Sequence, residues 1–329
     1  MNSVLLGRAA MKTSSVPPLR NSEGDWVFEN VEKADLLGRT FLSKSQLPEQ
    51  DGVCPPDEKN ARQTSFALLR VKTTASILKA LNVDKATGPD HLPGRILKEC
   101  ADELAEPVTQ LARHMLQAGV WPDCWRDHWV TPLYKKKSVS DPGNYRGVHL
   151  TAVLSKAIER VISNVLSEYL EASGAVSKTQ WAFKVGHSSR DLAALFANKC
   201  ILALHRGEKV GVYLSDISGA FDRVSQTLLL EKLQAAGVSE DMLRFIGSYL
   251  QSRRSTVIVG GSTSQEFILE DTVFQGTVLG PRFWNVFFDD VSAAVPAEFQ
   301  SKKFADDLTC LKVFAKETKN DEIHGSLRE

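Results

Sequence analysis

The amino-acid sequence predicts an α+β fold. The chain has 329 residues, of which 43% are hydrophobic and 24% are charged, a composition typical of a globular protein that buries a sizeable core. Segments with helical spacing and segments with strand-like character follow one another without a regular βαβ alternation. Two of the predicted strand pairs are hairpins, which favours an α+β arrangement over a doubly wound parallel sheet.

The first 66 residues are poorly patterned. Pro17-Pro18, Pro48 and Cys54-Pro55-Pro56 interrupt any long element. We therefore interpret residues 1–66 as a tail or linker that carries one short helix near Val31–Leu42.

Residues 67–206 are mainly helical. Gly119 should end one of the helices, and Pro107 should kink or split the same helix. Pro132 lies in a short predicted strand. Because proline cannot donate a main-chain hydrogen bond, either this strand lies at a sheet edge or Pro132 lies at its start. The predicted helices cover residues 71–82, 95–118, 151–172 and 191–205, and the strand covers residues 129–134.

Residues 207–329 contain most of the predicted strands. Val210–Leu214 is apolar and predicts a buried strand that runs almost directly into Asp216. Gly260-Gly261 predicts a hairpin turn, and a second hairpin surrounds Asp306-Asp307. The predicted strands cover residues 210–214, 255–259, 266–269 and 304–314, and the predicted helices cover residues 225–236, 239–251 and 282–294.

Three acidic sites are candidates for chemistry. Asp216 follows an apolar strand, where a carboxylate is costly to bury unless it is paired or binds a cation. Asp306-Asp307 suits the tip of a tight hairpin, where two side chains can approach one point. Asp289-Asp290 lies in a predicted helix, where adjacent residues do not face each other, and indicates a solvated helix face.

A cluster of Asp216 with Asp306 and Asp307 makes chemical sense with a divalent metal. Like charges a few ångströms apart raise one another's pKa unless a cation neutralises them. Carboxylate oxygens suit Mg²⁺ or Mn²⁺ rather than zinc. Two such ions serve in-line displacement at phosphorus, so the pattern indicates phosphoryl chemistry with two ions.

The overall charge gives no argument for nucleic-acid binding, because 40 Lys and Arg residues balance 40 Asp and Glu residues. A local basic segment exists in spite of that balance. Residues 126–146 carry five basic and two acidic side chains, a net charge of +3. Such a segment is compatible with a basic groove in a neutral protein.

Three segments together resemble the reverse transcriptases. Gly211–Val224 resembles motif A, Phe274–Phe288 resembles motif B and Phe304–Asp307 resembles motif C, in the order of that family. Upstream segments resemble the polymerases of non-LTR (LINE-type) retrotransposons, and so does one segment between motifs A and B: residues 86–90, 133–146, 180–188 and 248–254. The resemblance runs from about residue 70 to residue 315.

This resemblance implies roles for the acids and for an aromatic ring. Asp216, Asp306 and Asp307 would form the catalytic, metal-binding acid set, with Asp307 the less direct ligand. Phe221 would be a steric gate, because a bulky ring there collides with a ribose 2′-OH and favours dNTPs.

The resemblance also implies contacts to the nucleotide and the template. Gln275 and Gly276 would shape the pocket for the template and the incoming base, since glycine allows close backbone approach. Arg146 would bind the triphosphate, because its planar fork suits phosphate. A lysine of the run 135–137 would join Arg146 at the triphosphate. We name Lys136 as the candidate, but the choice among the three lysines stays open.

The expected protein is an RNA-directed DNA polymerase with an RNA template, a DNA primer and dNTPs as partners. Its expected architecture is a right-hand polymerase, with fingers and the start of the palm over residues 67–206 and the palm over residues 207–329. The sequence stops 22 residues after Asp307, so we expect a fragment in which the thumb is missing. Gly147 and Phe274 depart from the family, which usually has proline after Arg146 and before Gln275.

Three alternatives remain. An RNA-dependent RNA polymerase is disfavoured by Phe221 at the gate and by Ala305, where such enzymes have glycine. A non-catalytic, RNA-binding polymerase remnant would bind without incorporating nucleotides, and an unrelated scaffold would make the motif order a coincidence.

The sequence gives less about the surroundings of the protein. No run approaches the ~18 apolar residues of a membrane span, so we expect no membrane partner. The five cysteines are widely spaced and include no CxxC, which favours a reducing compartment, so we expect an intracellular location, in either nucleus or cytoplasm. The sequence does not indicate the oligomeric state.

Overall fold

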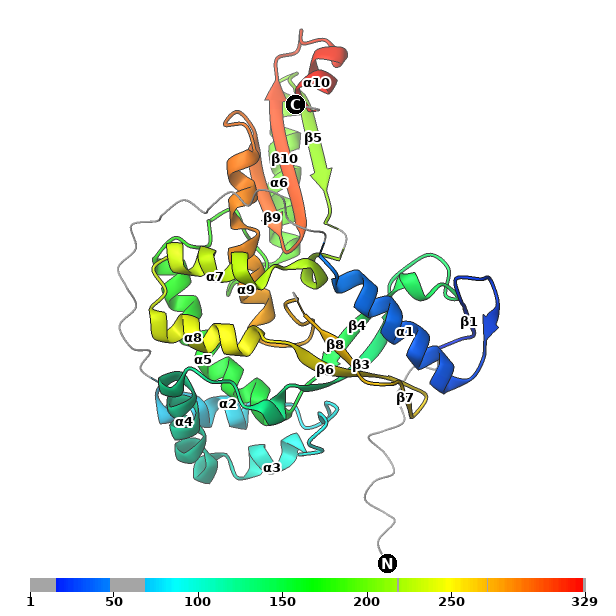
Figure 1. The fold of residues 1–329 in the computed structure, drawn as a ribbon. Coiled ribbons are helices and arrows are strands. Elements are labelled where there is room, and N and C mark those ends of the chain that lie inside the picture. The colour runs from blue at the N-terminus through cyan, green and yellow to red at the C-terminus, as the bar shows by residue number, and fades with distance from the viewer. Residues whose placement is uncertain (1–15, 48–68, 218, 271, 328–329) are drawn as a thin grey trace, which may run out of the picture.

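Helices and sheets in which most strand pairs are antiparallel make up the structure without a βαβ alternation, as an α+β fold predicts. The computed structural model describes residues 16–47, 69–217, 219–270 and 272–327. A three-stranded sheet with two helices, α6 (Ser189–His205) and α10 (Asn320–Ser326), stands at one end of the molecule, and a five-stranded sheet and most helices form the broader body (Figure 1). Among these described residues, no helix combines the length and the apolarity that crossing a membrane requires.

The N-terminal segment is folded where it is described. β1 (Leu19–Arg20) and β2 (Trp26–Val27) form a small hairpin, and α1 (Asn30–Ser45) follows them. The predicted helix is therefore confirmed, but residues 16–47 do not form a tail. Leu37 and Phe41 lie on one face of α1 and pack against Val130 and Val257 of the five-stranded sheet. Residues 1–15 and 48–66 of the expected tail lie outside the described residues.

A helical layer occupies the lower part of the body. The helices predicted over residues 71–82 and 151–172 are confirmed, and Gly119 ends α4 with a φ of +66° as expected. The predicted 95–118 helix is split at Cys100 rather than at Pro107, which α4 accommodates in its interior. The helices of this layer are α2 (Val71–Lys79), α3 (Gly94–Glu99), α4 (Ala101–Ala118), α5 (Val153–Ala172) and α8 (Glu240–Leu250).

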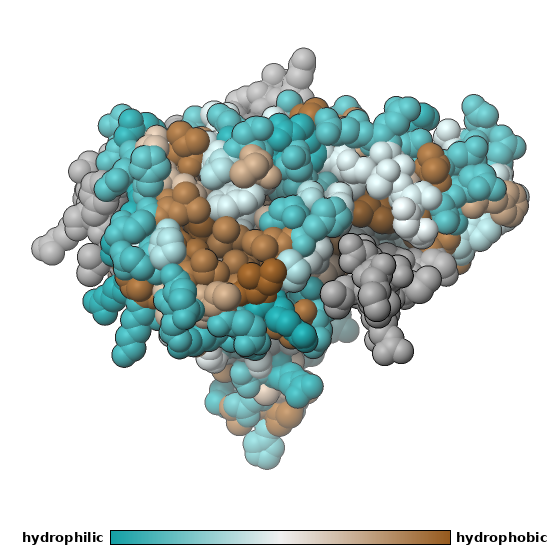
Figure 2. All heavy atoms as spheres, turned by 90° about the horizontal axis from the view of Figure 1, so that it is seen from below, coloured by the Kyte–Doolittle hydropathy of each residue, from teal (hydrophilic) through white to brown (hydrophobic). Residues whose placement is uncertain are grey.

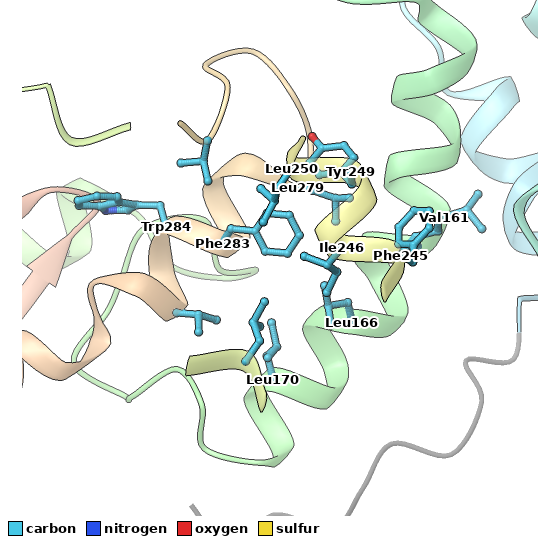
Figure 3. Close-up of a cluster of buried hydrophobic side chains, with 14 of the residues drawn as sticks. Val161, Leu166, Leu170, Phe245, Ile246, Tyr249, Leu250, Leu279, Phe283 and Trp284 are labelled. Atoms are coloured by element: carbon cyan, nitrogen blue, oxygen red, sulfur yellow. The ribbon is translucent and has the colours of Figure 1, made fainter. Parts of the chain in front are cut away.

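The main hydrophobic core lies where three helices meet. Figure 3 shows side chains of α5, α8 and α9 (Gly280–Phe287) pointing toward one another, among them Leu166, Ile246 and Phe283. These three side chains are almost completely buried. The segment that resembles motif B is thereby seated on the core, and burial of each such side chain contributes about 1.5–3 kcal/mol.

The five-stranded sheet is built on two strands that the sequence predicts. β3 (Asp127–Tyr134) pairs antiparallel with β4 (Tyr145–Leu150) and parallel with β6 (Arg253–Val259). The β6 pairing ends at Val130, so Pro132 lies where β3 has only β4 beside it within this sheet, a position that tolerates proline. β7 (Ser262–Thr263) and β8 (Phe267–Leu269) also pair with β6, which confirms the predicted hairpin.

The three-stranded sheet has the order β5-β10-β9. It contains β5 (Lys209–Ser215), β9 (Gln300–Phe304) and β10 (Asp307–Phe314), all antiparallel to their neighbours. The strand at residues 210–214 is confirmed, but its predicted burial is wrong. Leu214 is 73% exposed, because the sheet face on which its side chain stands is open to solvent at this point.

The remaining elements connect these parts. The predicted helices 191–205 and 225–236 are confirmed as α6 and α7, whereas the predicted helix 282–294 is α9 followed by a 3₁₀ turn. The elements are α6 (Ser189–His205), α7 (Gln226–Ala235), α10 (Asn320–Ser326), η1 (Asp123–Trp125), η2 (Pro142–Asn144), η3 (Ala220–Arg223) and η4 (Asp289–Ala294).

The lower end of the molecule is not uniformly hydrophilic. Figure 2 views the end at which α2, α3 and α4 lie, and apolar side chains gather left of centre within a hydrophilic surround. Ile96 of α3 and Leu111 of α4 are exposed apolar side chains of these helices.

Candidate active site

Three carboxylates lie at the same end of the three-stranded sheet. The antiparallel register pairs Leu308 of β10 with Ser215 of β5, so Asp216 and Asp307 are neighbours across the two strands. Phe304 pairs with Asp307, which leaves Ala305-Asp306 as a two-residue hairpin loop. The fold thus brings the predicted acids to one edge, although almost a hundred residues separate Asp216 from the loop.

The three carboxylates interact electrostatically. Burial raises the pKa of Asp307, and the negative charges of Asp306 and Asp216 raise it further, while Lys135 opposes the shift. The described part of the chain contains no group of three His, Cys, Asp or Glu side chains close enough together to hold a metal ion. The strand register brings the three acids to the same end of the sheet. Their side chains would have to turn toward one another to bind one metal ion together.

The donor set fits a hard divalent cation. All candidate ligands are carboxylate oxygens, which Mg²⁺ and Mn²⁺ prefer. A cation between Asp216, Asp306 and Asp307 would offset the repulsion that raises the pKa of Asp307. These are the residues that would hold the ions.

An open pocket of about 450 Å³ lies beside this edge. Asp216 and Asp307 form part of its wall, and Phe196 of α6 forms another part. The carboxylates consequently face a space that a substrate can enter rather than a closed interior.

Phe221 is held in an aromatic stack. Its ring lies over Trp284 of α9 with centroids 5.6 Å apart and planes inclined by 21°, and Phe183 meets it edge-on at 6.4 Å. The Phe221 carbonyl accepts hydrogen bonds from Val273 N (3.0 Å) and Thr272 Oγ1 (2.8 Å). Both contacts fix the ring and the backbone of the predicted gate.

The loop before α9 is attached to β4. The Gln275 carbonyl accepts a hydrogen bond of 2.8 Å from His149 N. Gly276 has a φ of +102°, and a Cβ at this position would lie 2.6 Å from the His149 carbonyl oxygen. Glycine is therefore required here both by its backbone conformation and by the closeness of β4.

Glu159 is a buried acid that the sequence interpretation missed. Its Oε2 accepts hydrogen bonds from Val278 N (2.7 Å) and Leu279 N (3.1 Å), directly before α9, and from the Tyr249 hydroxyl (3.2 Å). Burial raises the pKa of Glu159, which is only 1% exposed. Its position beside Ile158 on the apolar stripe of the predicted 151–172 helix was the signal that could have identified it.

The basic residues lie in and beside the β3–β4 loop. Arg146 is exposed on β4 opposite Leu133, and Lys136 is exposed in the loop. Lys135 is the lysine of this run whose charge lowers the pKa of Asp307 and of Asp222. Of the three lysines among which the sequence left the choice open, Lys135 is the one whose charge acts on an acid of the candidate site.

The Asp289-Asp290 pair lies outside this edge. Asp290 is exposed, as predicted, whereas Asp289 is largely buried and is not part of a solvated helix face. Asp289 pairs with the buried Lys303 at 3.2 Å and accepts a hydrogen bond from Ser177 N at 2.8 Å. Asp290 pairs with Lys232 at 2.7 Å. Both acids have structural partners, and Asp289 attaches β9 to the end of α9.

The comparison with protein families places the chain among the nucleotidyltransferases. The chain belongs to the reverse transcriptase (RNA-dependent DNA polymerase) family, whose model matches residues 134–325. This family uses divalent metal ions, an RNA template and nucleotide substrates.

Curated relatives narrow the group to retrotransposons. The chain is 26% identical over 319 residues to the RNA-directed DNA polymerase from mobile element jockey of Drosophila funebris, covering 91% of this chain and 34% of that protein. The jockey protein of Drosophila melanogaster is 27% identical over 290 residues, covering 84% and 31%. The probable RNA-directed DNA polymerase from transposon BS of Drosophila melanogaster is 26% identical over 250 residues, covering 74% and 28%.

These matches confirm the resemblance to non-LTR retrotransposon reverse transcriptases. The chain spans about a third of the length of these curated relatives.

Proposed function

We propose that this chain catalyses RNA-templated DNA synthesis with Asp216, Asp306 and Asp307 as its catalytic acids. The observation that carries the proposal is the β5–β10 register, which sets Asp216 beside Asp307 and next to the Asp306 loop. In this reaction the primer 3′-OH attacks the α-phosphate of a dNTP, and pyrophosphate leaves.

The acids hold the ions in this proposal. When bound, two Mg²⁺ or Mn²⁺ ions activate the attacking oxygen and stabilise the leaving group. Asp216 and Asp306 are the direct ligands, and Asp307 acts less directly. The open pocket beside Asp216 and Asp307 is compatible with entry of a nucleotide and a primer end.

The remaining site residues bind and select the nucleotide. Phe221, fixed on Trp284, excludes a ribose 2′-OH and so favours dNTPs. Arg146 binds the triphosphate together with Lys135 or Lys136. Gln275 and Gly276 shape the pocket for the template and the incoming base.

We also propose a correspondence with the right-hand polymerase architecture. Residues 67–206, which include the basic β3–β4 loop, correspond to the fingers and the start of the palm, and residues 207–329, which include the three-stranded sheet, α7 and α9, correspond to the palm. The partners are an RNA template, a DNA primer and dNTPs, and the location is intracellular.

Primer extension tests this function. The purified chain receives an RNA template annealed to a labelled DNA primer, Mg²⁺, and either dNTPs or rNTPs. We expect extension with dNTPs alone, and an Asp306→Ala/Asp307→Ala double variant should lose at least 10³-fold in rate if both acids hold the ions. Asp290→Asn is the matched control, because it removes an acid outside the site.

Two results would contradict the proposal. Equal extension with rNTPs would overturn the gate role of Phe221 and favour an RNA polymerase. Binding of the hybrid by a folded chain that extends no primer would favour the non-catalytic remnant.

A further inference from the structure

Gln180 contacts the hairpin loop that carries the catalytic acids. Its Nε2 donates to the Ala305 carbonyl at 3.3 Å, and its Oε1 accepts from Ala305 N at 3.1 Å. Both main-chain polar groups of the residue before Asp306 are therefore satisfied by one side chain. Gln180 itself is 1% exposed, so this contact is shielded from water.

The contact of Gln180 with Ala305 continues a short parallel pairing between residues 179–181 and β9 beyond the end of β9. Lys303 of β9 pairs in parallel with Gln180, through Trp181 N to Lys303 O (2.9 Å) and Lys303 N to Thr179 O (2.8 Å). In a continued parallel ladder, main-chain groups beyond Trp181 would bind Ala305. The Gln180 amide, which carries one carbonyl and one NH₂ group, takes the place of that peptide.

The Gln180 side chain is also held from its other side. Its Oε1 accepts a second hydrogen bond, from Ala182 N at 3.0 Å. The Ala182 carbonyl in turn accepts a bond of 3.1 Å from Asn285 of α9. Residues 180–182 therefore contact both the hairpin loop and α9, and these contacts fix the orientation of the Gln180 amide.

Ala305 needs such a support. Its φ is +55°, a left-handed conformation that is unfavourable for a residue with a Cβ. Strained backbone of this kind persists where the surroundings over-determine it. Ala305 immediately precedes Asp306, so a change in its φ would re-aim both acids.

We propose that Gln180 is a positioning residue for the Asp306–Asp307 pair. It holds Ala305 in its positive-φ conformation and so sets the direction in which the two carboxylates leave the hairpin. The role in catalysis rests on the proposed function, whereas the role in holding the loop does not.

The test replaces Gln180 by methionine, which has a similar length but cannot form the two hydrogen bonds that the Gln180 amide makes with Ala305. In hydrogen exchange measured by mass spectrometry, the peptide that contains Ala305 should exchange at least tenfold faster in Gln180→Met than in the wild type. The Mn²⁺ dissociation constant, measured by calorimetry, and the Mg²⁺ concentration for half-maximal extension should each rise at least fivefold. Unchanged dNTP KM values would separate this effect from a general loss of the site.

Thr109→Val is the matched control. Thr109 is fully buried, and its hydroxyl donates a hydrogen bond of 2.7 Å to Thr74 Oγ1 where α4 packs on α2. The valine variant therefore loses a buried hydrogen bond that does not involve the hairpin. It should change neither the exchange of the Ala305 peptide nor the metal requirement. If Gln180→Met does not fold, Gln180→Glu replaces the NH₂ donor by a carboxylate oxygen and also adds a negative charge, so hydrogen exchange of the Ala305 peptide is its readout and should again be at least tenfold faster.

The outcomes separate the two claims. Wild-type exchange at Ala305 in the Gln180 variant would overturn the proposal, as would faster exchange with an unchanged metal requirement in an active chain. A folded wild type that neither extends primers nor binds Mn²⁺ would contradict the proposed function, and the exchange data would still decide whether Gln180 holds the loop.

Discussion

At the scale of single residues, Gly276 shows how one missing side chain joins two parts of the molecule. Its positive φ and its distance from the His149 carbonyl oxygen act together. We predict that Gly276→Ala lowers the free energy of unfolding by more than the 1–2 kcal/mol of left-handed strain, because the Cβ must also displace β4. Denaturant unfolding of the variant measures this loss.

The control for this prediction is Gly261→Ala. Gly261 has a similar φ of +86°, and a Cβ there meets no atom within 4 Å. It should therefore show the strain cost alone. If the two variants lose the same free energy, the contact with β4 does not constrain the loop before α9.

Two histidines behind the same loop give the protein a pH dependence. Nδ1 of His128 and Nδ1 of His149 lie 3.0 Å apart in the interior, and both rings pack on Phe274. Burial, with the charges of Arg253 and Lys156, lowers the pKa of His149 to about 3, and burial lowers that of His128 as well. Both side chains are therefore neutral in the folded state near neutral pH.

We predict that stability falls as the pH drops below about 6.5. The unfolded chain takes up protons at these histidines near pH 6.5, whereas folded His149 does so only at about pH 3 and the pKa of folded His128 also lies well below 6.5. The stability is therefore fully present above pH 6.5 and falls as the pH drops below it, for each histidine at about 1.4 kcal/mol per pH unit until the folded state also takes up the proton.

Urea unfolding between pH 7 and pH 5 measures this slope. His149→Gln should remove roughly half of it, and the exposed His114→Gln should leave it unchanged. A wild-type slope that survives in His149→Gln would show that other groups cause the pH dependence.

At the scale of elements, α1 contributes to the five-stranded sheet although it lies far from it in the sequence. Leu37 is fully buried against this sheet, and Phe41 packs beside it. We predict that Leu37→Ala lowers the free energy of unfolding by about 2–5 kcal/mol, as for a buried leucine. Val31→Ala, on the exposed face of α1, should change it by less than about 0.5 kcal/mol in a denaturant titration.

The helices and strands were largely predictable because their signals are local. The apolar stripe of residues 151–172 predicts the last residue of α5 correctly and its first residue to within two positions. What packs on an element was not predictable, since it depends on partners distant in the sequence. The sequence predicted α1 but not its sheet, and it predicted β5 but not that Leu214 is exposed.

The same limit applies to the site. The motif spacing identified Asp216 and Asp306-Asp307, and the structure brings them to one edge. Gln180 and Glu159 act through hydrogen bonds to main-chain groups more than a hundred residues away, and no local pattern reports such contacts. Sequence reasoning therefore predicted which acids lie together, but not the residues that hold the segments around them.

At the scale of the whole molecule, the charges are balanced in number but not in position. The formal net charge is zero, yet Lys135, Lys136 and Arg146 lie together in and beside the β3–β4 loop. The charge of Lys135 also reaches Asp307 at the acidic edge. Nucleic-acid backbone binding in a neutral protein should therefore depend on this loop rather than on the surface as a whole.

We predict that Lys135→Gln/Lys136→Gln reduces the salt dependence of binding to an RNA–DNA hybrid. Each phosphate contact contributes about 0.9 to the slope of log K against log salt for a duplex, so loss of both should reduce the slope by up to about 1.8. Lys316→Gln/Lys319→Gln makes the same charge change beyond Phe314, at the end of β10 away from the acids, and should leave the slope unchanged. Fluorescence anisotropy at several salt concentrations measures both variants. Equal slopes in the two would mean that the hybrid is held elsewhere and that the β3–β4 loop does not correspond to the fingers.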